Sequence, residues 1–474
     1  MSQNSSAKTA AELSATGIRI SVSESERFAA SLDNTRYSAL PDCVAHAEKP
    51  EDIGRILRVA HKNATPVTVR GRGTGCAAGC VPFCGGIVLD VSAIDFIEID
   101  APARVAHVGA GAVTADIDAA ARKFGLMYAP DPSSHKYSSI GGNIACNAGG
   151  LRAAKYGVTR EHVLALSAFL ADGTRIKCGL PLRKFSAGPN LRDFFIGSEG
   201  TLGVLCEAWL KLLPAPEKKR AALAYFDGDS AGFEAVEKIM LSPLQPAVLE
   251  FMDVETVACV RAREPSFKIP RGSCALLAEF DSADADAEAS LFISLLRELS
   301  NGTARAAKDD AEAEELWRVR RSASPAMYGL GNAKLNQDIV LPLEKTREFF
   351  KFFKQLGNGI GLPTPVFGHA ADGNYHIHFM YDANDEGARS RALEGMRAAI
   401  EKAIEMGGAV SGEHGIGALK SKYMAIQHGE AELKLMRAIK RAFDPKNILN
   451  PDKVYTVADL PNAAPLKGVK LPWD

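Results

Sequence analysis

Short apolar runs alternate with helical patterns along the first half of the chain. Three such runs, at residues 66–69, 86–91 and 105–109, predict buried strands. Segments 51–62 and 114–124 place apolar residues at helical spacing. Glycine is frequent between these segments, which is typical of a compact α+β domain. We assign this domain to residues 35–215 and expect residues 1–34 to form a flexible tail and lead-in.

The pattern changes in the second half, where longer and more charged helices are predicted. These lie at residues 230–240, 283–299, 309–321, 344–356 and 388–406, and strand patterns at 274–280 and 338–342 interrupt them. Strands separated by helices predict a sheet covered by helices on one face. The sequence therefore indicates a second α+β domain at 216–411, followed by a C-terminal segment, 412–474.

Composition excludes several classes of protein. The net charge is −1, so no basic field favours nucleic acid. No run of 18 apolar residues predicts a membrane span, and the polar N-terminus lacks the apolar core of a secretory signal. Nine cysteines, an odd number, favour free thiols in a reducing cytoplasm. Cys76, Cys80 and Cys84 match no common zinc or iron–sulfur spacing, so we interpret them as small loop residues.

A histidine pair flanks a strong turn signal. Asp372-Gly373 is typical of a two-residue hairpin turn, which requires positive φ at both central positions. With these two residues at the centre, His369 faces His376, and their Cβ atoms are expected ~5 Å apart. Both imidazoles could then bind one metal ion. The alternative is a polar hairpin tip that carries histidines by chance.

Three glycine-rich segments predict close approach of the backbone to a large ligand. Gly71-Arg72-Gly73-Thr74-Gly75 lies between two strands, whereas a nicotinamide-binding Rossmann unit needs a helix directly after its loop. The loop can still bind an anion through converging N–H groups. Segments 140–150 and 197–204 are the other two, and tight turns in a compact domain are the alternative interpretation.

These segments, together with 411–417 and 444–451, carry a resemblance that covers residues 35–455. The chain resembles the vanillyl-alcohol-oxidase superfamily, and within it the D-2-hydroxyacid dehydrogenases, which include D-lactate and D-2-hydroxyglutarate dehydrogenases and the flavoprotein subunit of glycolate oxidase. The resemblance implies a two-subdomain FAD-binding domain and assigns residues 216–411 to a substrate or cap domain. It also implies that residues 412–474 return to the FAD domain and the active site. It implies FAD contacts at Arg72, Gly73, Thr74, Gly75, Pro130, Gly141, Gly142, Asn143, Asn147, Gly149, Gly150, Glu199, Gly200 and Asn450. No histidine occurs between residues 62 and 106, so we expect noncovalent FAD.

The same resemblance implies metal ligands at His369, His376 and Glu413, with His414 as catalytic base. Two imidazoles and a carboxylate favour Zn²⁺, with Fe²⁺ or Mn²⁺ as alternatives. His378 is a spare ligand candidate because it shares a strand face with His376. The family usually has glycine where Ala371 stands, which removes no ligand. The family segment around 316–320 implies that Arg320 holds the substrate carboxylate.

The predicted activity is oxidation of a D-2-hydroxy acid by hydride transfer to the flavin. Relatives that act on dicarboxylates carry a lysine just before the strand at 338, and this chain has Asn336-Gln337 there. D-lactate or glycolate is therefore favoured, with D-2-hydroxyglutarate as the alternative. Electrons would pass to a quinone, an iron–sulfur subunit or an electron-transferring flavoprotein. The sequence leaves open whether the protein associates peripherally with the inner face of a membrane and whether it forms a homodimer. The competing functions are a metallohydrolase and a non-catalytic flavin-binding subunit.

Overall fold

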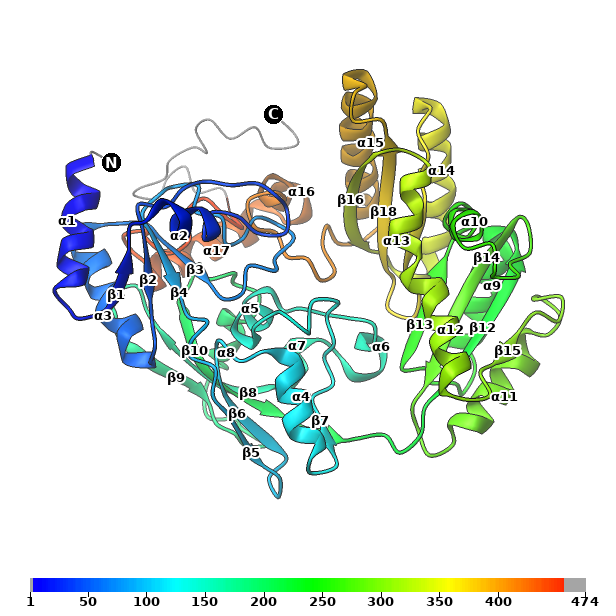
Figure 1. The fold of residues 1–474 in the computed structure, drawn as a ribbon, viewed down its shortest axis with the longest axis horizontal. Coiled ribbons are helices and arrows are strands. Elements are labelled where there is room, and N and C mark those ends of the chain that lie inside the picture. Colours follow the sequence, from blue (N-terminus) through cyan, green and yellow to red (C-terminus); the bar gives the residue numbers. More distant parts are fainter. Residues whose placement is uncertain (1–2, 456–474) are drawn as a thin grey trace. The chain divides into compact units, whose positions relative to one another are not determined.

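The computed structural model describes residues 3–455, and the chain divides into two compact units that we treat separately (Figure 1). The first comprises the described parts of Met1–Gly150, Gly157–Ala215 and Glu413–Asp474, and the second comprises Leu151–Tyr156 and Pro216–Gly412. Of the predicted C-terminal segment, residues 456–474 lie outside the described part. Among the described residues, no helix combines the length and apolar character that a membrane span requires.

The first unit contains two main sheets. The four-stranded sheet has the order β1-β2-β4-β3, with β2, β4 and β3 parallel, and comprises β1 (Arg19–Ser21), β2 (Cys43–His46), β3 (Val67–Arg70) and β4 (Ile87–Asp90). The antiparallel sheet has the order β5-β6-β10-β8-β9 and comprises β5 (Ile97–Asp100), β6 (Val105–Gly109), β8 (Val163–Phe169), β9 (Arg175–Gly179) and β10 (Val204–Lys211). A short pair joins β7 (Leu126–Met127) to β11 (Leu213–Pro214).

Helices complete the first unit: α1 (Gln3–Ser14), α2 (Glu24–Ala29), α3 (Pro50–Asn63), α4 (Thr114–Arg122), α5 (Ile140–Cys146), α7 (Thr159–His162), α8 (Arg192–Phe195), α16 (Met424–Gln427) and α17 (Glu430–Phe443). The predicted helix at 51–62 is confirmed, and its apolar residues Ile53, Ile56, Leu57 and Ala60 are buried in the core. The strand–loop–strand arrangement around residues 71–86 is also confirmed, because β3 and β4 are adjacent parallel strands.

The N-terminal segment departs from the flexible tail that was expected at residues 1–34. Most of it folds onto the first unit: α1 lies against α3, and β1 pairs with β2. Leu13 is fully buried, and Thr9 Oγ1 lies 3.1 Å from Thr65 Oγ1. The segment consists mainly of small and polar residues, so its composition did not indicate a helix that packs through only a few apolar residues. Residues 1–2 lie outside the described part.

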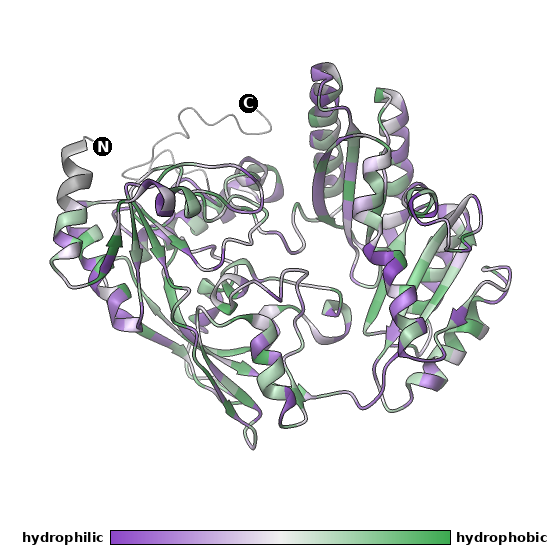
Figure 2. Cartoon of the chain, viewed as in Figure 1, coloured by the Kyte–Doolittle hydropathy of each residue, from purple (hydrophilic) through white to green (hydrophobic). Residues whose placement is uncertain are grey.

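The second unit is built on a seven-stranded antiparallel sheet with the order β15-β12-β14-β13-β17-β18-β16. Its strands are β12 (Arg220–Asp227), β13 (Val248–Met252), β14 (Ser273–Phe280), β15 (Arg305–Ala306), β16 (Ala333–Val340), β17 (Val366–His369) and β18 (Asn374–Tyr381). Figure 2 shows strongly hydrophobic residues along the central strands of this sheet. The strand predicted at 338–342 begins earlier, at Ala333, so that Lys334 lies inside it.

Helices pack on both faces of this sheet, which corrects the expectation of one covered face. Successive residues of β13 point to opposite faces: Met252 packs in one cluster with Val257 of α10, whereas Phe251 stacks on Phe233 of α9, with ring centroids 4.6 Å apart. The helices are α6 (Ala153–Tyr156), α9 (Gly228–Met240), α10 (Val254–Arg263), α11 (Ala285–Leu296), α12 (Asp310–Arg321), α13 (Ala323–Ala326), α14 (Thr346–Ile360) and α15 (Glu386–Glu405). Burial on both faces explains why β13 is almost continuously apolar.

Candidate functional site

The hairpin that carries the histidines has a different register from the predicted one. His369 pairs with Asn374, and Phe367 pairs with His376, so β17 and β18 are joined by four residues rather than two. Gly373 has a φ of +75°, but Asp372 has no positive φ, and its carboxylate accepts the N–H of Asn374 at 3.1 Å. The predicted two-residue turn is therefore wrong, because it requires positive φ at both central residues.

The error in register leaves the two imidazoles on the same face of the sheet. The shift is two residues, and side chains repeat along a strand with a period of two. His369 and His376 are thus diagonal neighbours, with ring centroids 5.5 Å apart and nearly perpendicular planes. Both side chains are buried, at 6% and 8% exposure. The predicted proximity of the pair therefore holds, although it rests on a different pairing.

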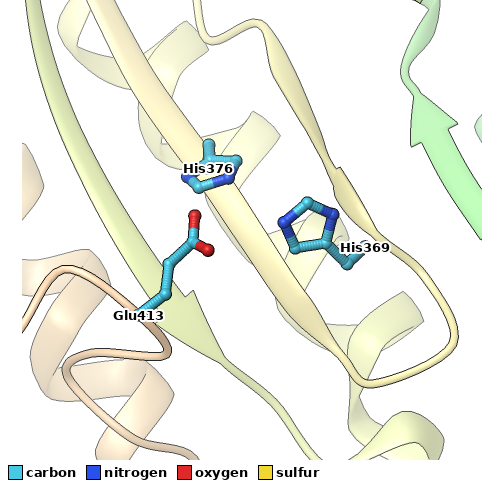
Figure 3. Close-up of side chains that lie close together, drawn as sticks. All are labelled: His369, His376 and Glu413. Carbon is cyan, nitrogen blue, oxygen red and sulfur yellow. The ribbon is translucent and has the colours of Figure 1, made fainter. Parts of the chain in front are cut away.

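Glu413 completes a three-residue group with these histidines. One ligand atom from each of His369, His376 and Glu413 lies within 4.8 Å of the other two, and Figure 3 shows the Glu413 carboxylate directed towards the imidazole of His376. Glu413 directly follows Gly412, whose N–H donates to the buried Asp338 carboxylate at 2.7 Å. Two imidazoles and one carboxylate are a donor set that fits Zn²⁺, Fe²⁺ or Mn²⁺.

Glu250 is a member of this site that the sequence reasoning missed. It is fully buried in the apolar strand β13, where its Oε1 bonds Nδ1 of His369 and its Oε2 accepts from Nε of Arg320 at 2.5 Å. Burial alone would raise the pKa of Glu250, but Arg320 and His369 outweigh it and hold the pKa at about 2. A carboxylate on Nδ1 fixes the imidazole tautomer and leaves Nε2 for a metal. The sequence signal that could have identified Glu250 is a single acidic residue within an otherwise apolar run.

Arg320 is oriented by the same carboxylate. Its guanidinium lies over the ring of Phe367, 4.3 Å from the centroid, and its side chain is 13% exposed. Only Nε is used by Glu250, and within the described part of the chain the two terminal nitrogens form no hydrogen bond. Two parallel N–H donors suit bidentate binding of a carboxylate.

His378 lies outside the ligand group. It is 1% exposed, and its Nδ1 lies 3.0 Å from the carbonyl oxygen of Pro365. Burial, together with the positive charge of Lys334, lowers the pKa of His378 to about 3. The group within 4.8 Å contains only His369, His376 and Glu413 among the described residues. His378 is therefore a neutral structural imidazole in this arrangement.

Replacing Glu250 by alanine is expected to destabilise the protein by about 3–5 kcal/mol, because it leaves Arg320 buried without its carboxylate. The measurement is the midpoint of urea unfolding. Glu237→Ala is the matched control, since its pair with Arg347 is 3.0 Å long but about half exposed at both ends and should contribute less than about 1 kcal/mol. Equal losses of stability in the two variants would contradict a special role for Glu250.

The three glycine-rich segments meet around one pocket of the first unit. Its volume is about 620 Å³. Ten of the sequence-predicted FAD residues line it: Arg72, Gly73, Thr74, Gly75, Gly141, Gly142, Asn143, Gly149, Glu199 and Gly200. Glu413 and His414 also line the pocket. The predicted proximity of loops far apart in sequence is thus present in the structure.

The pocket wall fits a large phosphorylated ligand. Ser139 is 2% exposed, lines the pocket and has a hydroxyl without a hydrogen-bond partner among the described residues. A Cβ on Gly71 would lie 2.2 Å from that hydroxyl oxygen, so glycine is required where the loop passes it. A free hydroxyl beside glycine-loop N–H groups and Arg72 is suited to phosphate oxygens. The residues present therefore fit the pyrophosphate of FAD.

Four predicted FAD residues do not line this pocket: Pro130, Asn147, Gly150 and Asn450. Pro130 is buried, and Asn147, with a φ of +51°, accepts the N–H of Arg160 at 3.0 Å. Gly150 passes Asp131 so closely that a Cβ would lie 2.6 Å from its backbone. The amide of Asn450 donates to the carbonyl oxygens of Gly79, at 2.9 Å, and Glu199, at 2.6 Å.

Glu199 connects the pocket to the segment that carries His414. Its carboxylate accepts the N–H of Ile416 at 2.7 Å and of Gly417 at 2.9 Å. Burial raises the pKa of Glu199, and these two backbone donors oppose the rise. His414 Nε2 lies 3.9 Å from Glu413 Oε1, and its side chain is 20% exposed. The backbone around the proposed base is therefore held by an acidic residue of the pocket wall.

This arrangement of sheets and glycine loops defines an FAD-binding oxidoreductase, and comparison with known proteins agrees. Residues 215–454 match the family model of the FAD linked oxidases, C-terminal domain, and residues 41–179 match the FAD binding domain. The chain belongs to the FAD-linked oxidases of the vanillyl-alcohol-oxidase superfamily, in the D-2-hydroxyacid dehydrogenase family. It is an FAD-dependent enzyme, which confirms FAD and the family predicted from the sequence.

Several relatives align with nearly the whole chain. The glycolate oxidase subunit GlcD of Bacillus subtilis (strain 168) is 35% identical, with 91% of this chain and 93% of the relative covered. A D-lactate dehydrogenase of Archaeoglobus fulgidus is 36% identical, with coverages of 87% and 90%. One of Anaerostipes hadrus is 32% identical, with coverages of 88% and 90%.

Solved structures confirm the fold class. p-Cresol methylhydroxylase superposes with a TM-score of 0.77 at 17% identity, covering 96% of this chain and 97% of that one. 4-Ethylphenol oxidase from Gulosibacter chungangensis superposes with a TM-score of 0.74 at 20% identity, and 98% of each chain is covered. At these identities the likeness concerns the fold alone.

Proposed function

We propose that this enzyme oxidises a D-2-hydroxy acid to the 2-oxo acid, with D-lactate or glycolate as the favoured substrate. The observation that carries the proposal is the presence of Glu413 and His414 in the wall of the flavin pocket. A base beside the flavin is what removal of a hydroxyl proton during hydride transfer requires. The curated relatives named glycolate oxidase subunit and D-lactate dehydrogenase support the same class of substrate.

The roles of the residues follow from their chemistry. His414 accepts the proton of the substrate hydroxyl, and Arg320 binds the substrate carboxylate through its two free nitrogens. His369, His376 and Glu413 would hold a divalent metal, zinc or alternatively iron or manganese, which when bound makes a hydroxyl more acidic. FAD, held without a covalent bond, supplies the acceptor for hydride. Glu250 orients both His369 and Arg320.

The electrons leave to an acceptor that the enzyme must contact. A quinone, an iron–sulfur subunit or an electron-transferring flavoprotein would each accept them, with peripheral membrane association and a homodimer as open features of the proposal. A metallohydrolase would have no use for the flavin pocket, and a non-catalytic flavin subunit would not need Glu413 and His414. The FAD-dependent oxidoreductase family therefore favours the dehydrogenase over both.

One observation favours D-2-hydroxyglutarate as a second candidate substrate. Lys334 lies on β16, on the same face as Asn336 and Asp338, which pair with His378 and His376. Its ammonium donates to Ser324 Oγ at 2.7 Å, and among the described residues it has no carboxylate partner. Burial lowers the pKa of Lys334. A lysine inside this strand weakens the preference for a monocarboxylate that Asn336-Gln337 suggested.

Anaerobic bleaching of the bound flavin tests the proposal. The holoenzyme is mixed with D- and L-lactate, glycolate, and D- and L-2-hydroxyglutarate. Reduction is followed as the loss of the absorbance of oxidised flavin at about 450 nm. We expect rapid bleaching by one D-hydroxyacid or glycolate and little by the L-enantiomers. Bleaching by D-2-hydroxyglutarate that is lost in Lys334→Gln would select the second candidate. No bleaching by any member of the panel would refute the substrate class.

A further inference from the structure

Asp33 lines the flavin pocket and has a buried carboxylate oxygen without a hydrogen-bond partner among the described residues. It follows α2 in the chain, lines the pocket and is only 4% exposed. Thr35 uses one oxygen, Oδ1, through its N–H at 2.9 Å and its hydroxyl at 2.5 Å. The other oxygen, Oδ2, is buried and has no partner in the described part of the chain. A buried acceptor of this kind costs free energy unless a donor reaches it.

The surroundings of Oδ2 direct it towards the glycine loop. A Cβ on Gly75 would lie 3.5 Å from Oδ2, so the loop backbone passes close by and no side chain covers the oxygen from this position. The nearby cations are used elsewhere. Arg70 donates to the carbonyl of Leu32 at 2.7 Å, and Lys453 donates to the carbonyl of Gly79 at 2.9 Å.

We propose that Asp33 is an FAD-binding residue, and that its Oδ2 accepts a hydrogen bond from an N–H or O–H group of the bound cofactor. FAD offers such groups on its adenine, sugar, ribityl chain and flavin ring, whereas its phosphates are acceptors and would be repelled by a carboxylate. Asp33 therefore selects a donor-bearing part of FAD. The Ser139 hydroxyl and Arg72, which also line the pocket, would suit the phosphates instead. This inference needs only FAD binding and is independent of the substrate and the metal.

Retention of FAD by purified holoprotein tests the assignment. Wild type, Asp33→Ala, Asp33→Asn and Thr35→Val are diluted serially, and the fluorescence of released FAD gives the dissociation constant. Asp33→Ala is expected to weaken FAD binding by about 10- to 100-fold, as for loss of a hydrogen bond to a charged group. Asp33→Asn keeps an amide oxygen without the charge and should weaken binding by about 3- to 10-fold. Thr35→Val leaves Oδ2 in place and should stay within about threefold of wild type.

Three results would overturn the proposal. The first is an Asp33→Ala holoprotein, folded by circular dichroism, that binds FAD within threefold of wild type. The second is tighter binding in Asp33→Asn, which would mean that the charge opposes the cofactor. The third is an equal loss in Thr35→Val and the Asp33 variants, which would assign Asp33 only to the geometry of its loop. If Asp33→Ala is insoluble, the comparison of Asp33→Asn with Thr35→Val decides.

Discussion

Replacing His414 by alanine is expected to leave FAD bound while slowing flavin reduction by a hydroxyacid ~10²–10⁴-fold, the usual contribution of a general base. His414 lines the flavin pocket, and its side chain remains 20% exposed, so a substrate hydroxyl can reach it. The backbone that follows is held by Glu199 through the N–H groups of Ile416 and Gly417, neither of which the substitution removes. The pocket should therefore keep its shape.

Anaerobic stopped-flow absorbance at saturating substrate measures the effect on the reduction step alone. His428→Ala is the matched control, because it removes a partly exposed imidazole from the same C-terminal segment and should reduce flavin at the wild-type rate. Added imidazole should restore part of the rate in His414→Ala, which a merely structural defect would not permit. Reduction of His414→Ala within threefold of wild type would rule out His414 as the base.

Much of the fold was predictable because local pattern and burial agree. Residues 51–62 have apolar positions at helical spacing, and they form a helix. The 71–75 loop has the glycines of a turn, and the apolar runs on either side of it form strands. The helices on both faces of the seven-stranded sheet were not predicted, because the sequence does not show on which face each connecting helix packs. The N-terminal helix was missed because only a few buried residues, such as Leu13, hold it against the domain. The composition of the segment as a whole is polar and does not reveal them.

The site was predictable where chemistry is local and not where it depends on tertiary packing. His369 and His376 share a strand face whether the connecting turn has two residues or four, so their proximity survived an incorrect register. Glu250 lies more than a hundred residues from His369, and only the pairing of β13 with β17 brings them together. The strand predicted at 338–342 began too late, because β16 starts at Ala333, with mostly polar residues before the apolar run. Strand pairing, rather than residue type, decides such contacts.

Replacing His376 by alanine is expected to remove the bound metal and, with it, turnover. Three protein ligands and open positions form a complete site for a catalytic divalent ion, and two ligands bind far more weakly. His376 contributes one of the three ligand atoms that lie within 4.8 Å of one another. The metal content of purified holoprotein, measured by elemental analysis, should fall from about one ion per chain to a small fraction of that. The flavin spectrum should persist, because the glycine loops that line the flavin pocket lie elsewhere in the sequence.

His378→Asn is the control that separates metal binding from strand integrity. This buried imidazole lies two residues along β18, faces the same side and bonds the carbonyl of Pro365, outside the ligand group. Its substitution should perturb packing while the metal content stays near that of wild type. A chelator should abolish turnover of the wild-type enzyme without releasing FAD, and readdition of zinc, iron or manganese identifies the ion that restores it. Equal metal content in His376→Ala and His378→Asn, or full activity of the metal-free enzyme, would show that the three side chains do not form a catalytic metal site.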